Sequence, residues 1–551
     1  MQSLNSNPLA RACAGVHHVL VALLLGTVLQ AAAEPLKTRP YPLCGYWLFG
    51  RADAAAWSNT LARIGSLGAD TVIQFGVRLS RKSAEDLRAH PLFSRCPFAD
   101  AEANIPPRHL YTFETQERFG PALLADPSRD RFIDLGDSLV WRLVLQAPAG
   151  SQAPSNAPPV YDIVYLSGRK NDSVAALLNA ASARGAHVYA GLPCAPTDPR
   201  YPWDPDLAAL PVLEELTRRI LADYAERYRA QPSFAGVYQS QETPVSKNCL
   251  PRVLAVYRSQ HALVRSLLPG KAILVSPYWD ARKNNLNGTD LASVRAGIRL
   301  LARQNVDIIA PQDSRGTGKV GLFWPDQAAA PVDSRLEPAV GPAAYGDAYH
   351  ATTTDLYRTA REALDEAAAQ EGLRVALWAN IEAFEPGRKE SGSSSIQRTT
   401  HERLDQAIMF AGIHPSKLIC FMWDNYFTTR GKQALSLGDE LAACERRPIV
   451  VQVLPLKAAG VTGLLVRGYH MEDTRAEIAF ADVKGQQQTV SLPVEGLPHS
   501  VRPDVAYPLP ARLQTAWVTF DTARLSDASR AELTLIRERA RSFHPYRFTR
   551  E

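Results

Sequence analysis

The feature that most constrains the fold is an alternation of short apolar runs with amphipathic helical patterns, from about residue 43 to about residue 445. Eight runs have the length of strands and lack polar alternation, which is typical of strands covered on both faces. Eight strands with interleaved helices predict an α/β fold, a (β/α)8 TIM barrel, and an open doubly wound sheet is the alternative. The predicted strands are Leu43–Phe49, Thr71–Phe75, His187–Leu192, Phe234–Gln239, Ala272–Ser276, Val306–Ala310, Arg374–Ala379 and Leu418–Trp423.

Helical patterns lie between these runs. Leu213, Leu216, Ile220 and Tyr224 recur at three- and four-residue steps, which places them on one face of a helix. A further helix is expected to start at Thr289-Asp290, because Asp at this position can accept hydrogen bonds from the first free N–H groups.

Two segments depart from the alternation. Residues 77–160 carry many prolines and strand-like pieces, and they predict a large insertion after the second strand, placed over the barrel mouth. Residues 446–551 contain strand patterns only, which predicts a C-terminal β-sandwich domain. The predicted domains are therefore a targeting segment over 1–33, a barrel over 34–445 that carries the insertion, and the sandwich.

The first 33 residues read as a signal peptide. Arg11 is their only charge, an apolar run extends from Val19 to Leu29, and three alanines precede Glu34. Cleavage before Glu34 would leave a periplasmic or secreted protein with no membrane span, and an uncleaved anchor is the alternative. Six cysteines follow this segment; Cys194 and Cys249 are the predicted disulfide, with free thiols as the other possibility.

Composition narrows the possible partners. A net charge of +5 over 551 residues, without a dense Lys/Arg block, argues against a nucleic-acid partner. The 12 histidines show no metal-ligand spacing, and residues 316–321 match GxGxxG but run into Leu322-Phe323-Trp324 instead of a helix. The sequence therefore predicts no metal and no organic cofactor, and it does not determine the oligomeric state.

Carboxylates, amides and aromatic residues follow the predicted barrel strands, where barrel enzymes carry their catalytic groups. Glu242 follows the fourth strand and Glu382 the seventh. A retaining glycosidase needs two carboxyl groups about 5 to 5.5 Å apart and an inverting one needs about 6.5 to 9.5 Å, so this pair is the predicted catalytic pair. The alternative is that each is a hydrogen-bonded rim residue or a ligand clamp.

The other strand-end residues are predicted to bind sugar hydroxyls or stack on sugar rings. Trp279 and Trp423 in particular are expected to face the cleft, and Asp280, Asp313, Glu385 and Asp424 are reserve carboxylates. The predicted substrate-binding residues are Gln241, Tyr278, Trp279, Asp280, Gln312, Asp313, Trp378, Asn380, Trp423 and Asp424.

Three segments carry a resemblance to a known family: Pro277-Tyr278-Trp279, Ile308 to Asp313, and Leu377 to Glu385. Over roughly residues 40–445 the chain resembles a bacterial family known as a domain of unknown function, DUF4434, which is itself similar to TIM-barrel glycoside hydrolases. The resemblance implies a carbohydrate substrate and a retaining mechanism.

The resemblance also implies roles for the pair, with Glu242 as acid/base and Glu382 as nucleophile. One position departs from the wider group of retaining barrels, because Gln241 precedes the acid/base where an Asn is usual. The function that results is an exported glycoside hydrolase acting on a poly- or oligosaccharide. The alternative is a non-catalytic polysaccharide-binding barrel of the cell envelope.

Overall fold

The structure is a computed structural model that describes residues 39–51, 53–96, 107–147, 159–198, 201–248, 250–388, 394–430, 434–458, 460–502, 505, 507–526, 530–538 and 540–550. The predicted signal peptide and Cys249 lie outside the described residues. Residues from Pro40 onward form one compact unit.

Eight parallel strands close into a barrel in the order β1-β17-β14-β13-β12-β11-β8-β2. The ring closes because β1 pairs with β17 on one side and with β2 on the other. Each predicted strand run contains or overlaps one barrel strand, so the predicted barrel is confirmed and the open sheet is wrong. The barrel strands are β1 (Gly45–Leu48), β2 (Thr71–Gln74), β8 (His187–Gly191), β11 (Phe234–Gln239), β12 (Ala272–Val275), β13 (Ile308–Ile309), β14 (Ala376–Glu382) and β17 (Lys417–Phe421).

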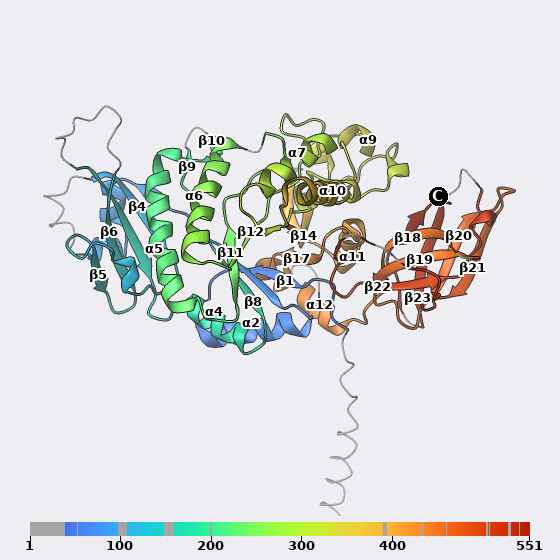
Figure 1. Cartoon of the computed structure of the whole chain (residues 1–551), viewed down its shortest axis with the longest axis horizontal. Coiled ribbons are helices and arrows are strands. Elements are labelled where there is room, and N and C mark those ends of the chain that lie inside the picture. Colours follow the sequence, from blue (N-terminus) through green and yellow to red (C-terminus); the bar gives the residue numbers. More distant parts are fainter. Residues whose placement is uncertain are drawn as a thin grey trace, which may run out of the picture. The chain divides into compact units, whose positions relative to one another are not determined.

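Helices connect these strands, and a side chain caps the first turn of α2, α4, α7, α10, α11 and α12. Asp290 accepts a 2.8 Å hydrogen bond from the N–H of Ser293, as predicted for the helix that starts there. The helices around the barrel are α2 (Ala54–Ser66), α4 (Ser173–Ser182), α5 (Leu210–Tyr228), α6 (Pro251–Leu267), α7 (Leu291–Ala302), α8 (Glu337–Val340), α9 (Tyr345–Ala348), α10 (Thr353–Glu371), α11 (His401–Ala411) and α12 (Leu437–Ala443) (Figure 1).

Side chains fill the inside of the barrel, and a larger apolar layer separates the strands from the helices. The interior is a buried cluster to which alternate strand residues contribute, because successive residues of a strand point to opposite faces. This cluster contains Trp47, Ile73, Tyr189, Tyr238, Leu274, Ile308, Ala310, Trp378, Ile419 and Met422.

The insertion after β2 forms its own five-stranded sheet, in the order β3-β4-β7-β6-β5, with the short helix α3 (Ala84–Ala89). Figure 1 labels three of these strands, β4, β5 and β6. Because β7 lies between β4 and β6, the insertion runs beyond its predicted end at residue 160. The strands are β3 (Ser80–Lys82), β4 (Pro107–Glu114), β5 (Arg131–Asp134), β6 (Leu139–Gln146) and β7 (Tyr161–Gly168).

Polar contacts fasten the inserted segment to α5. Arg219 of α5 pairs with Asp130 at 2.7 Å, and both side chains are buried. Tyr224 of the same helix donates a 2.5 Å hydrogen bond to Glu117. The insertion therefore packs against an outer helix of the barrel, which differs from the predicted position over the mouth.

The strands after residue 445 form two sheets with a shared apolar core, and this confirms the predicted sandwich. One sheet contains β18, β19 and β22, and the other contains β20, β21, β23, β24 and β25. Their bounds are β18 (Ile449–Ala458), β19 (Val461–Tyr469), β20 (Arg475–Ala481), β21 (Gln487–Pro493), β22 (Gln514–Val518), β23 (Ala531–Arg537), β24 (Ala540–Arg541) and β25 (Tyr546–Phe548).

Residues of this C-terminal part hold the segment that leads into β1. The His470 ring lies 2.9 Å from the carbonyl oxygen of Pro40, and Arg512 donates a 2.8 Å hydrogen bond to the carbonyl oxygen of Tyr41. Over the described residues, no helix has the length and apolar character needed to cross a membrane.

Two short hairpins complete the described strands. They are formed by β9 (Thr197–Asp198) with β10 (Tyr201–Pro205), and by β15 (Phe384–Arg388) with β16 (Ser394–Arg398). Cys194, which precedes the first hairpin, is a free thiol whose sulfur lies 3.2 Å from Oε1 of Gln241, so the predicted bridge to Cys249 is wrong.

Candidate active site

Glu242 follows the carboxyl end of β11 and opens onto a cavity of about 670 Å³. Its side chain is exposed to the cavity, and Gln312 donates a 2.9 Å hydrogen bond to Oε1. Protein around the cavity displaces water from the carboxyl group and raises its pKa, an effect that Gln312, Lys319 and Arg78 oppose. Glu242 can therefore reach a ligand in the cavity and hold a proton at higher pH than an ordinary glutamate.

Glu382 is the last residue of β14 and is 3% exposed. Its Oε2 accepts a 2.6 Å hydrogen bond from the N–H of Gly316, and its carbonyl oxygen accepts one from Arg315. Burial, and then the neighbouring charge of Asp313, raise the pKa of Glu382 to about 8. The Gly316 N–H and the charges of Arg315 and Lys319 favour its ionised form.

Arginine pairing separates these two glutamates from the four other strand-end carboxylates. Among the described residues, neither Glu242 nor Glu382 has an arginine or lysine within ion-pair distance. Each of the four others does. The pairs are Asp280 with Arg282 at 2.8 Å, Asp313 with Arg315 at 3.3 Å, Asp424 with Arg51 at 2.5 Å, and Glu385 with Arg335 at 3.2 Å and with Arg403.

Lys319 interacts electrostatically with both Glu242 and Glu382. The charges of Asp280, Glu382 and Glu242 all raise the pKa of its ammonium group, while burial, the largest influence, lowers it. Strands β11 and β14, which carry the glutamates, are separated in the ring by β12 and β13. Lys319 follows β13, so its charge acts on both carboxylates from the segment between them.

Two of the predicted amide residues make hydrogen bonds inside the protein, near the ends of the barrel strands. Gln241 is buried, and its carbonyl oxygen accepts a 2.7 Å hydrogen bond from Tyr257. Asn380 is also buried and donates a 3.0 Å hydrogen bond to Ser276. Of the three predicted amides, Gln312 is the one that contacts a predicted catalytic carboxylate.

The predicted tryptophan subsites are wrong, because all three side chains are buried. Trp279 is 0% exposed and packs edge-on against Tyr357, and Trp423 is 1% exposed and stacks on Phe427. Trp378 belongs to the cluster inside the barrel. Tyr278 differs from them: it is half-buried and lines the cavity beside Glu242.

A chain of aromatic rings at the barrel mouth was missing from the predicted site. Phe49 and Phe75, which follow β1 and β2, lie with ring centroids 5.0 Å apart, and Phe421 of β17 is 5.7 Å from Phe75. Phe384 contacts both Phe421 and Tyr426. Phe49 is 47% exposed, so this row offers an apolar face to a ligand. A signal existed in the sequence, since each of these residues ends or follows a barrel strand.

The segment after β13 supplies three residues that sequence reasoning did not assign. Arg315 pairs with Asp313, Gly316 donates to Glu382, and Lys319 lies 3.9 Å from the ring centroid of Tyr278. A Cβ on Gly316 would lie 2.7 Å from Oε2 of Glu382 and 2.3 Å from the Phe384 ring. The glycine is required because only a residue without a side chain allows its N–H this approach.

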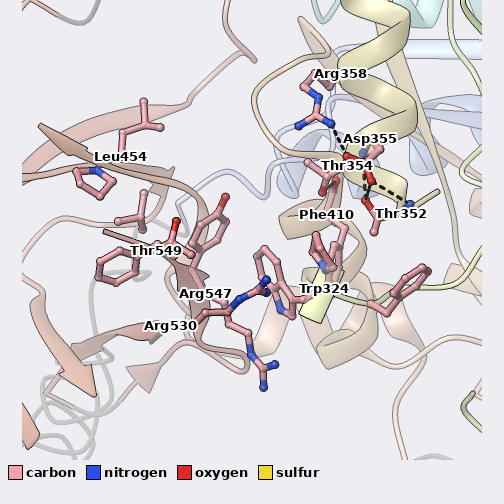
Figure 2. A pocket seen from close by; sticks show the side chains of 16 residues that line it. Trp324, Thr352, Thr354, Asp355, Arg358, Phe410, Leu454, Arg530, Arg547 and Thr549 are labelled. Carbon is pink, nitrogen blue, oxygen red and sulfur yellow. Dashed lines mark hydrogen bonds and ion pairs between the residues drawn. The ribbon is translucent and has the colours of Figure 1, made fainter. Parts of the chain in front are cut away.

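A second cavity, of about 290 Å³, lies between the loop at Trp324 and strands β18 and β25 (Figure 2). The Trp324 ring centroid is 4.9 Å from those of both Phe410 and Tyr546. Asp355 also lines this cavity. Its carboxylate accepts a 2.7 Å hydrogen bond from the Thr352 hydroxyl and a 2.5 Å hydrogen bond from Arg358. Its carboxylate is therefore already engaged, and we assign this cavity no chemistry.

Comparison with known proteins gives a family and a set of remote structures. The family model described as a domain of unknown function, DUF4434, matches residues 140–432, so the predicted resemblance is confirmed. No curated protein matches the sequence.

Among solved structures, a protein of Bacteroides thetaiotaomicron named as a candidate α-L-fucosidase is 14% identical. The structural match includes 74% of this chain and 93% of the other protein's chain, with a TM-score of 0.41. A β-galactosidase from Marinomonas ef1 is 8% identical, with a TM-score of 0.35. That match includes 72% of this chain and 58% of the β-galactosidase chain. The closed strand order of this chain itself establishes the barrel.

Proposed function

The chain belongs to the DUF4434 family, whose description names no reaction, and from its site we propose that it is a glycoside hydrolase acting on a poly- or oligosaccharide. One observation carries the proposal. Of the six carboxylates placed at the strand ends, Glu242 and Glu382 are the two without an ion-pair partner among the described residues, and both have raised pKa values. Such groups are suited to proton transfer and nucleophilic attack.

In the proposed mechanism Glu382 attacks the anomeric carbon, and the bond from that carbon to the glycosidic oxygen breaks. Glu242 gives its proton to the leaving oxygen. A water molecule, which returns a proton to Glu242, then attacks the same carbon and releases Glu382, so the configuration is retained. Gln312 would hold Glu242, and the Gly316 N–H would hold Glu382 in position.

The pH dependence follows from the two carboxyl groups. Hydrolysis needs Glu382 ionised, so activity should rise with pH, and it should fall when Glu242 loses its proton. Since burial and Asp313 raise the pKa of Glu382 to about 8, we expect the ascending limb well above the ordinary carboxyl range near about 4.

The surface offered to a sugar also supports the proposal. The row from Phe49 to Tyr426 provides aromatic faces, and the cavity beside Glu242 continues into a neighbouring cavity of about 520 Å³ that shares Leu250, Tyr278 and Asn287 with it. Because the two cavities share these lining residues, we propose that they receive successive sugar units of a chain. We propose export on the targeting pattern of residues 1–33.

The test is a screen of protein recovered from the periplasm or medium against bacterial and plant polysaccharides, scored by reducing ends, with N-terminal sequencing to check cleavage before Glu34. Glu382→Gln should lower turnover by orders of magnitude and leave the fold and glycan binding intact. Glu242→Ala should still accept a substrate with a very good leaving group, and added azide should yield a glycosyl azide of retained configuration.

Glu495→Gln is the matched control, because Glu495 is exposed and lies in the C-terminal part of the chain. If Glu382→Gln and Glu242→Ala keep the parent's activity, the assignment is wrong. If the parent binds glycans and cleaves none, the polysaccharide-binding function replaces hydrolysis.

A further inference from the structure

The cavity beside Glu242 holds an excess of positive charge. Its positively charged lining residues are Arg78, Arg282 and Lys319, and its negatively charged ones are Glu242 and Asp280. Asp280 is fully engaged, because it accepts two hydrogen bonds from the Arg282 guanidinium group, one from the Arg282 N–H and one from Asn285 at 2.6 Å. The charges of Asp280 and Glu382 act on Lys319, but the structure places no described carboxylate within ion-pair distance of Lys319 or Arg78. With Glu242 protonated, as a general acid must be, both cations can take an acidic ligand.

Lys319 is held in place by its backbone. Gly318 has φ of 71°, a left-handed conformation that favours glycine, and the Lys319 N–H donates a 3.1 Å hydrogen bond to the Ser314 carbonyl. The carbonyl of Lys319 accepts a 3.0 Å hydrogen bond from Ala281. Its half-buried ammonium group lies over the Tyr278 ring, and among the described residues no carboxylate lies within ion-pair distance of it.

Arg78 approaches the same cavity from the segment after β2. It is exposed, and one of its Nη atoms donates a 2.9 Å hydrogen bond to the carbonyl oxygen of Ala195. Its charge acts on Glu242, as that of Lys319 does. The planar guanidinium group can bind a second oxygen ligand through its remaining N–H groups.

We propose that this cavity selects a sugar unit that carries an acidic substituent, a carboxylate or a sulfate, bound by Lys319 and Arg78. The inference rests on the proposed function, since it names the substrate class of the same site. The aromatic row on the side of β1, β2 and β17 would take the apolar face of the glycan. The acidic group would lie on the opposite side, toward Lys319.

The experiment compares matched glycan pairs by calorimetry, using Glu382→Gln protein so that nothing is cleaved. One arm uses uronate-containing oligosaccharides and their carboxyl-reduced counterparts, and the other uses sulfated galactan oligosaccharides and their desulfated counterparts. The acidic member of one pair should bind roughly tenfold tighter or more, because hydrogen bonds between charged groups are stronger than those between neutral groups. The arm that shows the preference identifies the substituent.

Lys319→Met replaces the ammonium group with an uncharged side chain of similar length and should remove most of the preference for the acidic member. Arg78→Gln should act in the same direction, and because Arg78 is exposed, this variant keeps the proposal testable if Lys319→Met does not fold. Lys484→Met, at an exposed position in the turn between β20 and β21, is the matched control and should change nothing.

Equal affinity for acidic and neutral members in both arms overturns the inference. It is also overturned if Lys319→Met weakens both members alike, since Lys319 would then serve only to balance the charge of Glu242. Hydrolysis of a neutral glycan by the parent, together with equal affinity in both binding arms, refutes the inference and leaves the proposed function standing. A charge preference in a protein that cleaves no glycan supports the inference and refutes hydrolysis.

Discussion

Single side chains at the barrel mouth divide into those that face the cleft and those that support it, and Trp279 belongs to the second group. Its ring is fully buried and lies edge-on to Tyr357, with centroids 5.7 Å apart. Phe49, also at a strand end, is nearly half exposed. The two aromatic residues should therefore respond to truncation in opposite ways.

Trp279→Ala should lower the free energy of unfolding by about 3–5 kcal/mol, because it leaves a cavity in a packed core. Phe49→Ala, the comparison variant, should cost much less stability and weaken glycan binding. Urea denaturation and a binding titration on both variants check this. Should Trp279→Ala unfold at the parent's midpoint and lose binding, the ring would belong to the cleft after all.

The strand-end carboxylates could be predicted from the sequence, because parallel barrel strands bring all their carboxyl ends to one face. The sequence does not show which of them are neutralised. Asp424 pairs with Arg51, which lies more than 370 positions away in the sequence. This ion pair forms only when the first and last barrel strands pair and close the barrel. The orientation of Trp423 was equally hidden, since a strand-end position permits a side chain to point into the cleft or into the helical layer.

The segment after β13 is the element that organises the site. Within residues 312–319 it places Gln312 on Glu242, Gly316 on Glu382 and Lys319 over Tyr278. In the sequence its glycines resemble a nucleotide-binding fingerprint without the helix that such a site requires. Their actual use is a close approach of backbone to a carboxylate, which only the folded chain reveals.

Gly316→Ala should lower kcat by roughly ten- to a hundredfold, since the added methyl group must displace the segment and remove a hydrogen bond to a charged group of about 1.5–3 kcal/mol. Steady-state kinetics on a substrate of the parent measure the effect. Gly65→Ala in helix α2, where a Cβ meets no atom within 4 Å, is the control. An unchanged kcat for Gly316→Ala would show that its N–H does not position Glu382.

At the scale of the whole molecule, buried titratable groups set how stability depends on pH. Burial lowers the pKa of His261 and His401 to about 4. It raises the pKa of Asp405 to about 8, and that of Glu382 likewise. Between about 4 and 6.5 the unfolded state binds more protons at the histidines and fewer at the carboxyls, so the two effects oppose each other.

Above pH 6.5 the histidines are neutral in both states, and the carboxyls act alone. The folded state then holds protons that the unfolded state has released, so the free energy of unfolding should fall as pH rises from 6.5 to 8. Urea denaturation at several pH values measures the slope. Asp405→Asn, which keeps an acceptor for Tyr41, should flatten it. A free energy of unfolding that rises across this range would contradict the buried protonated carboxyls.

The contacts of Pro40 and Tyr41 with His470 and Arg512 also impose an order in time. A ribosome makes the first barrel strand more than 400 residues before it makes the side chains that hold its leading segment. Until those residues emerge, that segment lacks two of its hydrogen-bond partners. The earliest part of the barrel to be synthesised is thus among the last to complete its hydrogen bonds.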